Sequence, residues 1–457
     1  MFGRRLLAPA ERMVDVFDRG ATLNFLVVAQ VNGPLSADRL ESALRRLESR
    51  HPLLRARVER SEGGVAFVPG EARPIPLRVL EGPAGAWRAL AEEGLTHRVW
   101  DDAGPRAELT WLRHSPCESS LLLLFHHLVS DGSSGMFAMR DLLRLAAQPG
   151  LALAPIPAPA PSRFYPAGHG SLGWQLRTLR MLVASMFGPK PQRLRVEPRG
   201  ARKPEPEGAR TPRLARLRIP REESARLLQR ARRDGATVHG VLSAAFARAV
   251  ASQLGAGPAV ERILHPVDMR RYARAHHPGL ATPGEAVGYY VSSMETNHRV
   301  DPSSPLAPLA REVTQQIRDG KARGTPLMTA PIAGPMLSKR HERTAGDLPR
   351  FRDFVETKVV FDTFSLTNLG PLEQLGLEPS YGELTVADVY FVAAGSVLST
   401  LGGAVTTFGG ALTLTIGWVE PLVAREVAER VVSRIEHELA DYIGLATGAL
   451  PCEANAP

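Results

Sequence analysis

Cysteine and long apolar stretches are what this sequence has least of. Only Cys117 and Cys452 occur among 457 residues. Two cysteines are too few for a disulfide framework or a cysteine-based metal cluster, so a reducing, cytoplasmic location is expected. No apolar run approaches the roughly 20 residues that a membrane-spanning helix needs. The N-terminal stretch has no long apolar run and no clear cleavage site, so we expect no signal peptide.

Two signatures of catalysis are also absent. No nucleophile elbow of the G-x-S-x-G kind occurs, so the sequence gives no support for a covalent acyl-serine mechanism. No group of histidines, cysteines and carboxylates has the spacing of a recognisable metal centre. We therefore expect neither a metal ion nor a bound cofactor.

Acidic residues are scarce in one segment, and this scarcity accounts for the net charge of +9. Between residues 161 and 220 there are thirteen Arg or Lys against three Glu, a local charge of +10, so the remainder is close to neutral. A nucleic-acid-binding protein normally spreads its basic residues over a folded reading surface. The charge is instead confined to one segment, and we expect no nucleic-acid partner.

The length suits two domains of about 200 residues each. We expect an N-terminal domain over residues 1–150, a proline-rich linker with a basic amphipathic segment over 151–212, and a C-terminal domain over 213–457. Each half passes from a strand to a helix, capped by Ser36 or Thr237, and then to more strands. The fold class is therefore predicted to be α+β. Further strands are expected at 25–31, 263–270, 358–370 and 411–418, and further helices from 133 or 134, at 172–187 and from about 421.

The stretch 121–135, LLLLFHHLVSDGSSG, carries the densest functional signal. Its apolar run predicts a buried strand that ends in two adjacent histidines, with an Asp-Gly pair four residues later. Because side chains alternate across a strand, Phe125 and His127 would share one face and His126 would take the other. The two imidazoles therefore have different surroundings.

An imidazole accepts a proton near neutral pH and is the usual general base. His127 could thus deprotonate a hydroxyl or an amine that attacks an acyl carbonyl. Two other interpretations were weighed. A histidine pair at a strand end is often only structural, and a metal site of His126, His127 and Asp131 is disfavoured because adjacent strand histidines diverge.

The sequence here resembles a known family. The run from His126 to Gly132 matches H-H-x-x-x-D-G of the chloramphenicol-acetyltransferase-like superfamily. The superfamily includes nonribosomal peptide condensation domains, plant BAHD acyltransferases, wax ester synthases and polyketide-associated acyltransferases. Similar elements recur along nearly the whole chain, at RHPLLR (50–55), Thr237-Val238, PVDMR (266–270), GYYV (288–291) and TNLG (367–370). The BAHD motif D-F-G-W-G is absent, which argues against a plant-type enzyme.

The resemblance implies two chloramphenicol-acetyltransferase-like subdomains arranged as a V, with a tunnel between them. It makes His127 the general base and His126 a structural residue. Asp131 would also be structural, through a salt bridge to a domain-two arginine, for which Arg270 is the candidate.

The same resemblance implies that Gly132 leaves room for the donor. Thr367 and Asn368 would line the tunnel and bind substrate, although Asn368 could equally be a turn-former.

The implied activity is acyl transfer from a thioester donor, acyl-CoA or a phosphopantetheinyl acyl-carrier protein, directly to an alcohol acceptor. Secondary metabolism, with lipid or polyketide ester formation, is the expected setting. Two alternatives stay open: a free-standing condensation enzyme that forms an amide, and a catalytically silent carrier-binding module. A monomer is favoured.

The segment Leu172–Phe187 is predicted to be a basic amphipathic helix. It could be a lid, a membrane-surface contact that makes the protein peripheral to a membrane, or a dock for an acidic carrier protein. It could also be an ordinary linker helix packed on the domain.

Overall fold

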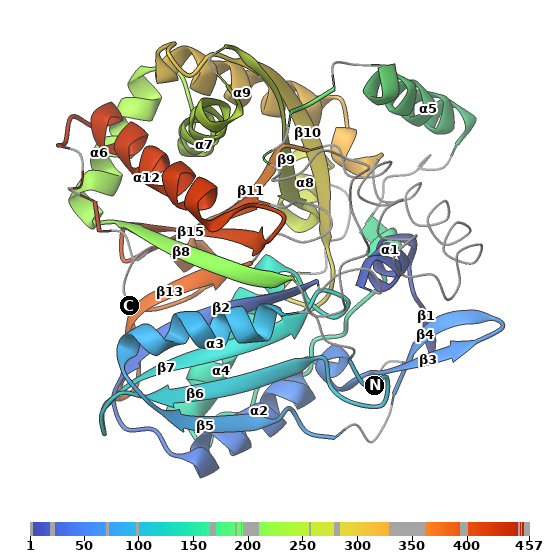
Figure 1. The fold of residues 1–457 in the computed structure, drawn as a ribbon. Coiled ribbons are helices and arrows are strands. Elements are labelled where there is room, and N and C mark those ends of the chain that lie inside the picture. Colours follow the sequence, from blue (N-terminus) through green and yellow to red (C-terminus); the bar gives the residue numbers. More distant parts are fainter. Residues whose placement is uncertain are drawn as a thin grey trace.

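In the computed structural model the chain folds into two lobes, each built around a six-stranded sheet (Figure 1). The structure describes the chain except residues 1–2, 19–22, 70–72, 97–99, 165–170, 188–189, 193, 195–209, 256, 278–283, 329–361, 394–400, 447, 449 and 452–457.

The N-terminal lobe has the sheet order β12-β13-β2-β7-β6-β5 and a small neighbouring sheet, β1-β4-β3. The strands are β1 Arg5–Leu6, β2 Asn24–Asn32, β3 Arg57–Ser61, β4 Gly64–Val68, β5 Leu77–Glu81, β6 Ala107–Arg113, β7 Glu118–His126, β12 Ser380–Tyr381 and β13 Leu384–Val392. The helices are α1 Pro9–Asp18, α2 Ala37–Arg50, α3 Trp87–Leu95 and α4 Gly132–Ala147.

Strand β7 shows why the central sheet of this lobe is apolar on both faces. Leu121, Leu123 and Phe125 pack into the cluster that contains the apolar sides of α2 and α4. Leu122 and Leu124 pack on the opposite face with α3. The alternation predicted for this strand is therefore present, and the strand delivers successive side chains to different layers.

The C-terminal lobe has the sheet order β10-β9-β11-β14-β15-β8, with α7, α9 and α12 packed on one face. The strands are β8 Thr211–Ile219, β9 Ala259–Asp268, β10 Val291–Val300, β11 Phe364–Pro371, β14 Leu401–Phe408 and β15 Ala411–Glu420. The helices are α6 Arg221–Arg233, α7 Val238–Leu254, α8 Met269–His276, α9 Leu306–Ala322 and α12 Arg425–Tyr442, and α5 Leu172–Phe187 lies between the lobes in the chain. Short 3-10 helices are η1 Pro52–Arg55, η2 Ala84–Ala86, η3 Pro161–Phe164, η4 Thr325–Leu327 and η6 Leu372–Leu375.

Strand β13 belongs to the N-terminal lobe although it lies late in the chain. It pairs antiparallel with β2, from Thr385 opposite Asn32 to Val392 opposite Leu26. It also contacts the other sheet, because the Thr415 hydroxyl of β15 donates to the Phe391 carbonyl at 2.7 Å. The division into 1–150, 151–212 and 213–457 stays a prediction, and β13 shows that the lobes do not follow chain order (Figure 1).

Most predicted elements are present, with two instructive differences. Ser36 and Thr237 cap α2 and α7 through their hydroxyls, as expected. The strand predicted over 263–270 ends at Asp268, because the Asp268 side chain accepts the Arg270 N–H and starts α8. Of the strand predicted over 358–370, residues 358–361 lie outside the described residues, and β11 begins at Phe364. Among the helices that are described, none combines the length and apolarity needed to cross a membrane.

Candidate active site

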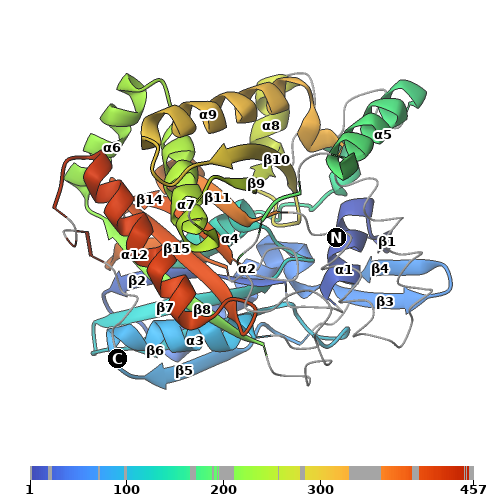
Figure 2. The same ribbon diagram turned by 45° about the horizontal axis from the view of Figure 1, so that its top comes forward.

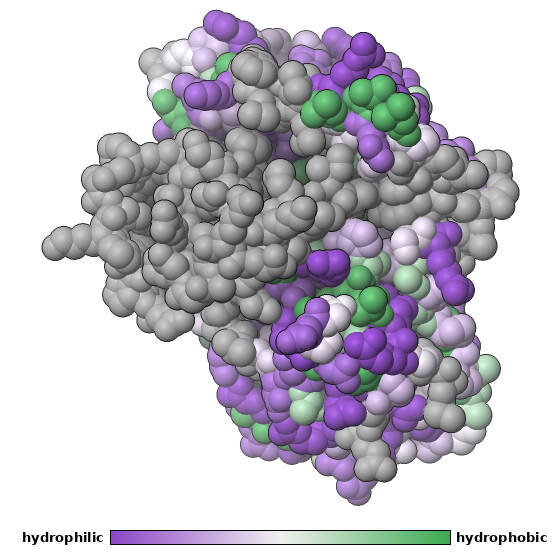
Figure 3. Space-filling model, turned by 90° about the vertical axis from the view of Figure 1, so that its right-hand side faces the viewer, coloured by the Kyte–Doolittle hydropathy of each residue, from purple (hydrophilic) through white to green (hydrophobic). Residues whose placement is uncertain are grey.

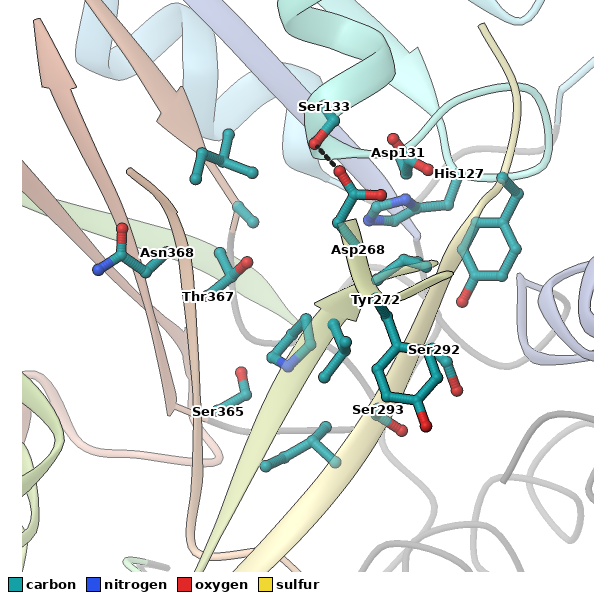
Figure 4. Close-up of a pocket in the computed structure, with 18 of the residues that line it drawn as sticks. His127, Asp131, Ser133, Asp268, Tyr272, Ser292, Ser293, Ser365, Thr367 and Asn368 are labelled. Carbon is teal, nitrogen blue, oxygen red and sulfur yellow. Dashed lines mark hydrogen bonds between the residues drawn. The ribbon is translucent and has the colours of Figure 1, made fainter. Parts of the chain in front are cut away.

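A cavity of about 500 Å³ lies between the two lobes, within the range of small-molecule sites (Figure 4). Both lobes contribute to its wall, and most of the lining is apolar. From the N-terminal lobe come α1, the start of α4 and β13, and from the C-terminal lobe come α8, β9, β10, β11 and β14. The lining residues include Met13, Val14, Phe17, Leu23, His127, Asp131, Gly132, Ser133, Asp268, Arg271, Tyr272, Tyr289, Lys321, Thr367, Asn368 and Phe391.

His127 lines this cavity immediately after the end of β7. Its backbone N–H donates to the Leu23 carbonyl at 2.9 Å, and its Nδ1 lies 3.2 Å from the Ser130 carbonyl oxygen. A carbonyl can only accept, so Nδ1 carries the proton when the ring is neutral and Nε2 is left as the acceptor. Phe25 and Tyr289 hold the ring, with centroids 4.6 Å and 6.0 Å away.

The surroundings of His127 keep its imidazole neutral. Burial lowers the pKa of His127 to about 4, and the hydrogen bond with Ser130 opposes this effect only in part. A neutral imidazole with its Nδ1 proton fixed can accept a proton at Nε2 throughout the neutral pH range. The His127 ring is therefore suited to accept a proton at Nε2 and is not suited to carry a permanent positive charge.

His126 faces the other side of β7. Its Nδ1 accepts the Leu128 N–H at 3.1 Å, its Nε2 lies 2.8 Å from Asp18 Oδ1, and its ring packs near Trp100. The ring is nearly inaccessible, at 2% exposure. The two histidines thus diverge, and among the described residues no group of three or more His, Cys, Asp or Glu side chains is placed to hold a metal ion.

Asp131 and Arg270 form a buried ion pair between the lobes. Arg270 Nη1 lies 3.0 Å from Asp131 Oδ2, and both side chains are 4% exposed. The carboxylate also accepts N–H groups from Ser134, at 2.8 Å, and Tyr290, at 2.7 Å. Arg270 donates further to the carbonyls of Gly284 and Ala286. Every charge in this pair is thus hydrogen-bonded, which is what makes its burial tolerable.

A second contact between the lobes lies beside this pair. The Ser133 hydroxyl donates to Asp268 Oδ2 at 2.7 Å, and Figure 4 shows this bond close to His127. Gly132 fits here because it has no side chain: a Cβ would lie 3.0 Å from Leu369 Cδ2 and 3.3 Å from Phe391 Cε2. A side chain at this position would therefore press against Leu369 of β11 and Phe391 of β13, and Gly132 itself lines the cavity.

Thr367 and Asn368 both line the cavity, from β11. The Asn368 side-chain oxygen accepts the Gly370 N–H at 2.8 Å and so supports the irregularity in β11 between Asn368 and Gly370. Its amide oxygen is engaged in this turn, which leaves the NH₂ group and the Thr367 hydroxyl as the polar groups for a substrate.

Sequence reasoning missed several residues of the cavity. Tyr289 stands edge-on to His127, and Asp268 bonds to Ser133. Both lie in segments, GYYV and PVDMR, that carry the family resemblance. The resemblance thus marked these segments but did not predict a role for Tyr289 or Asp268. Arg271 and Lys321 also line the cavity, and nothing in their local sequence predicted that these two cations would meet.

Two family models match the chain. One, described as the phthiocerol/phthiodiolone dimycocerosyl transferase C-terminus, matches residues 208–417, and the condensation-domain model matches residues 15–151. The chain is therefore similar to condensation domains in its first part and to the C-terminal part of this transferase in its second. The condensation-domain match covers the His127 region, and the other match covers most of the C-terminal lobe together with β12 and β13.

Several solved structures share this architecture over nearly the whole chain. The condensation domain of the monacolin K polyketide synthase MokA aligns over 98% of both chains, with 15% identity and a TM-score of 0.69. The trichothecene 15-O-acetyltransferase TRI3 of Fusarium sporotrichioides aligns over 96% of this chain and 95% of its own, with 13% identity and a TM-score of 0.70. Polyketide synthase associated protein 5 of Mycobacterium tuberculosis aligns over 96% of this chain and 98% of its own, with 15% identity and a TM-score of 0.62. At these identities the likeness concerns the fold.

The chain also matches short parts of long peptide synthetases. The nonribosomal peptide synthetase penN of Penicillium thymicola is 34% identical over 122 residues, 25% of this chain and 4% of penN. Cyclosporin synthetase simA of Tolypocladium inflatum is 29% identical over 133 residues, 29% of this chain and 1% of simA. The match thus spans only a small part of each synthetase.

Proposed function

We propose that this protein transfers an acyl group from a phosphopantetheine-linked thioester directly to an alcohol, forming an ester. The observation that carries the proposal is the state of His127: its Nδ1 proton is tied to the Ser130 carbonyl, its pKa is about 4, and its ring lines a cavity shared by both lobes. This is the arrangement of a general base at the meeting point of two substrates.

In the proposed step, Nε2 of His127 removes the hydroxyl proton while the alcohol oxygen attacks the thioester carbonyl. The tetrahedral intermediate collapses with cleavage of the carbon–sulfur bond. The leaving thiolate takes the proton back from the imidazolium, which returns the ring to its neutral form. The products are an ester and a free thiol, and no acyl group is attached to the protein at any stage.

Two cations support a phosphorylated donor. Arg271 and Lys321 line the same cavity as His127, and burial together with repulsion from Arg271 lowers the pKa of Lys321. Neither cation forms an ion pair with a carboxylate among the described contacts, and the carboxylates of Asp131 and Asp268 are engaged elsewhere. A phosphate of coenzyme A or of a carrier protein's phosphopantetheine would neutralise this charge.

The acceptor follows from the cavity wall. Met13, Val14 and Phe17 of α1, with Leu23 and Phe391, give the wall a largely apolar character. Such a wall favours an alcohol with a hydrocarbon body over a polar one. The runner-up is amide formation, which the match to the condensation-domain model favours.

The test is a panel of acyl-CoA and acyl-carrier donors with alcohols and amines, assayed with the wild type and with His127→Ala. Loss of the base should lower turnover by about 10²–10⁴-fold while donor binding persists. Unchanged turnover in His127→Ala would remove the proposed base. Preference for amines would favour amide formation, and tight carrier binding with no transfer across the panel would favour a silent binding module.

A further inference from the structure

Helix α5 exposes an apolar stripe that the proposed chemistry does not use. Leu172, Leu176 and Leu179 are 73%, 53% and 56% exposed. They make up half of the large exposed hydrophobic side chains in the described part of the chain, which are Leu6, Val79, Leu172, Leu176, Leu179 and Leu228. Spacings of four and three residues place the three leucines on one side of the helix.

Two side chains on the opposite side of α5 are buried. Trp174 and Thr178 are 7% and 0% exposed, and the Thr178 hydroxyl donates to the Trp174 carbonyl at 2.9 Å. At about 100° per residue these two side chains point away from the leucine stripe. Helix α5 thus has one side with buried side chains and an opposite side with exposed leucines.

The charged residues of α5 are both arginines. Arg177 and Arg180 are exposed, and in the helical projection Arg180 lies about 70° from the middle of the leucine stripe and Arg177 about 130° from it, on the same side. From residue 142 to residue 196 the sequence contains seven Arg or Lys and no Asp or Glu. The surface thus combines exposed hydrocarbon with cations, and no acidic side chain in this run offsets them.

Helix α5 lies on the same side of the molecule as α1, which lines the cavity (Figures 1 and 2). Upstream of α5 the chain contacts the residue next to the cavity residue Tyr289, because the Tyr290 hydroxyl donates to the Pro159 carbonyl at 2.8 Å. Figure 3, which views this side, shows hydrophobic residues beside hydrophilic ones near its top.

We propose that α5 lies in the surface of an anionic membrane, with Leu172, Leu176 and Leu179 among the lipid tails and Arg177 and Arg180 at the phosphates. A single outward-facing helix offers a convex stripe with no groove for a protein segment, and a bilayer needs no shape complementarity. The arginines require an anionic surface to compensate them. The helix rests on the bilayer without crossing it. This binding does not depend on the proposed acyl transfer.

The experiment is sedimentation of the full-length protein with vesicles of phosphatidylcholine containing about 30% phosphatidylglycerol, against vesicles of phosphatidylcholine alone. The wild type should bind the anionic vesicles, and binding should weaken as salt rises to about 0.5 M. Arg177→Gln with Arg180→Gln should weaken the partitioning by roughly 30-fold, about fivefold for each arginine. Replacing the three leucines by serine should reduce binding to anionic vesicles by more than tenfold.

Leu228→Ser provides the matched control, because Leu228 of α6 is also exposed, at 40%, but lies outside α5. It should bind vesicles like the wild type. The proposal is overturned if the leucine variant binds as the wild type does, or if the wild type ignores anionic vesicles. It is also overturned if the leucine changes abolish instead a dimer or binding to an acidic carrier protein, measured by analytical ultracentrifugation without lipid.

Discussion

At the scale of single residues, the proposed base and the ion pair between the lobes are separate groups. His127 meets the cavity with one ring nitrogen fixed. Asp131 and Arg270 are saturated by hydrogen bonds and close the contact between the lobes. Substitution of His127 is expected to change the turnover rate. Substitution of the ion pair is expected to lower the free energy of unfolding and to shift the position of the proposed base.

The pH dependence of turnover should follow the protonation of His127. Because the base must be neutral and burial lowers its pKa to about 4, turnover should be flat near neutral pH and fall as the pH drops through about 4. The unfolded chain takes up the same proton near pH 6.5, so protonation also favours unfolding as the pH falls below that value. Steady-state rates with circular dichroism at each pH separate the two effects. A fall in rate centred near pH 6.5 with the fold intact would contradict the assignment.

The Asp131–Arg270 pair should show strong coupling in the free energy of unfolding. Asp131→Asn keeps a cap for α4 but removes the nearer of the two carboxylates beside the buried Arg270, which leaves only Asp268, at 3.5 Å, and should cost about 3–5 kcal/mol. Arg270→Met removes that charge and should cost a similar amount. The double variant should be far more stable than the sum of the two predicts, as urea unfolding can measure. Additive losses would mean that the two charges act independently.

At the scale of elements, the positions of α4 and α8 depend on two aspartates that also hold the lobes together. Asp131 caps α4 and bonds to Arg270. Asp268 caps α8 and bonds to Ser133. The first turn of each helix is thus bonded to the other lobe. A substitution at either cap should therefore shift the position of the His127 ring.

Gly132 gives a test at this scale. Gly132→Val should cost about 1–3 kcal/mol of stability, because the added methyl groups meet Leu369 and Phe391. The matched control is Gly173→Val on α5, where a Cβ meets nothing within 4 Å. Thermal unfolding of both variants decides the matter, and equal losses would show that helix propensity rather than packing causes the effect.

Local sequence predicted much of this fold, and the reasons for the gaps are physical. Caps at Ser36 and Thr237, the β7 alternation and the α5 bounds depend on neighbours within one turn or one strand. The end of β9 at Asp268 was missed because a strand pattern and a helix start overlap in PVDMR. The pairing of β13 with β2, and the meeting of Arg271 with Lys321, depend on contacts between distant segments that no local pattern encodes.

For the whole molecule, the two lobes are joined through β13 and through contacts such as Arg213 with Glu92, at 3.0 Å. We expect a single unfolding transition, although a chain of this length often unfolds in steps. Variants that keep only Trp111 of the N-terminal lobe or only Trp418 of the C-terminal lobe report on each lobe by fluorescence. Coincident urea midpoints are expected, and separated midpoints would show that the lobes unfold independently.

The position of β13 also bears on how the protein is made. While the chain leaves the ribosome, the N-terminal sheet lacks β13, which ends only at Val392. Until then β2 is an edge strand whose apolar residues and free backbone groups have no partner. Nascent chains of this protein therefore expose an unpaired, apolar sheet edge for most of their synthesis. Chaperones that cover such edges should determine what fraction of the chains folds correctly.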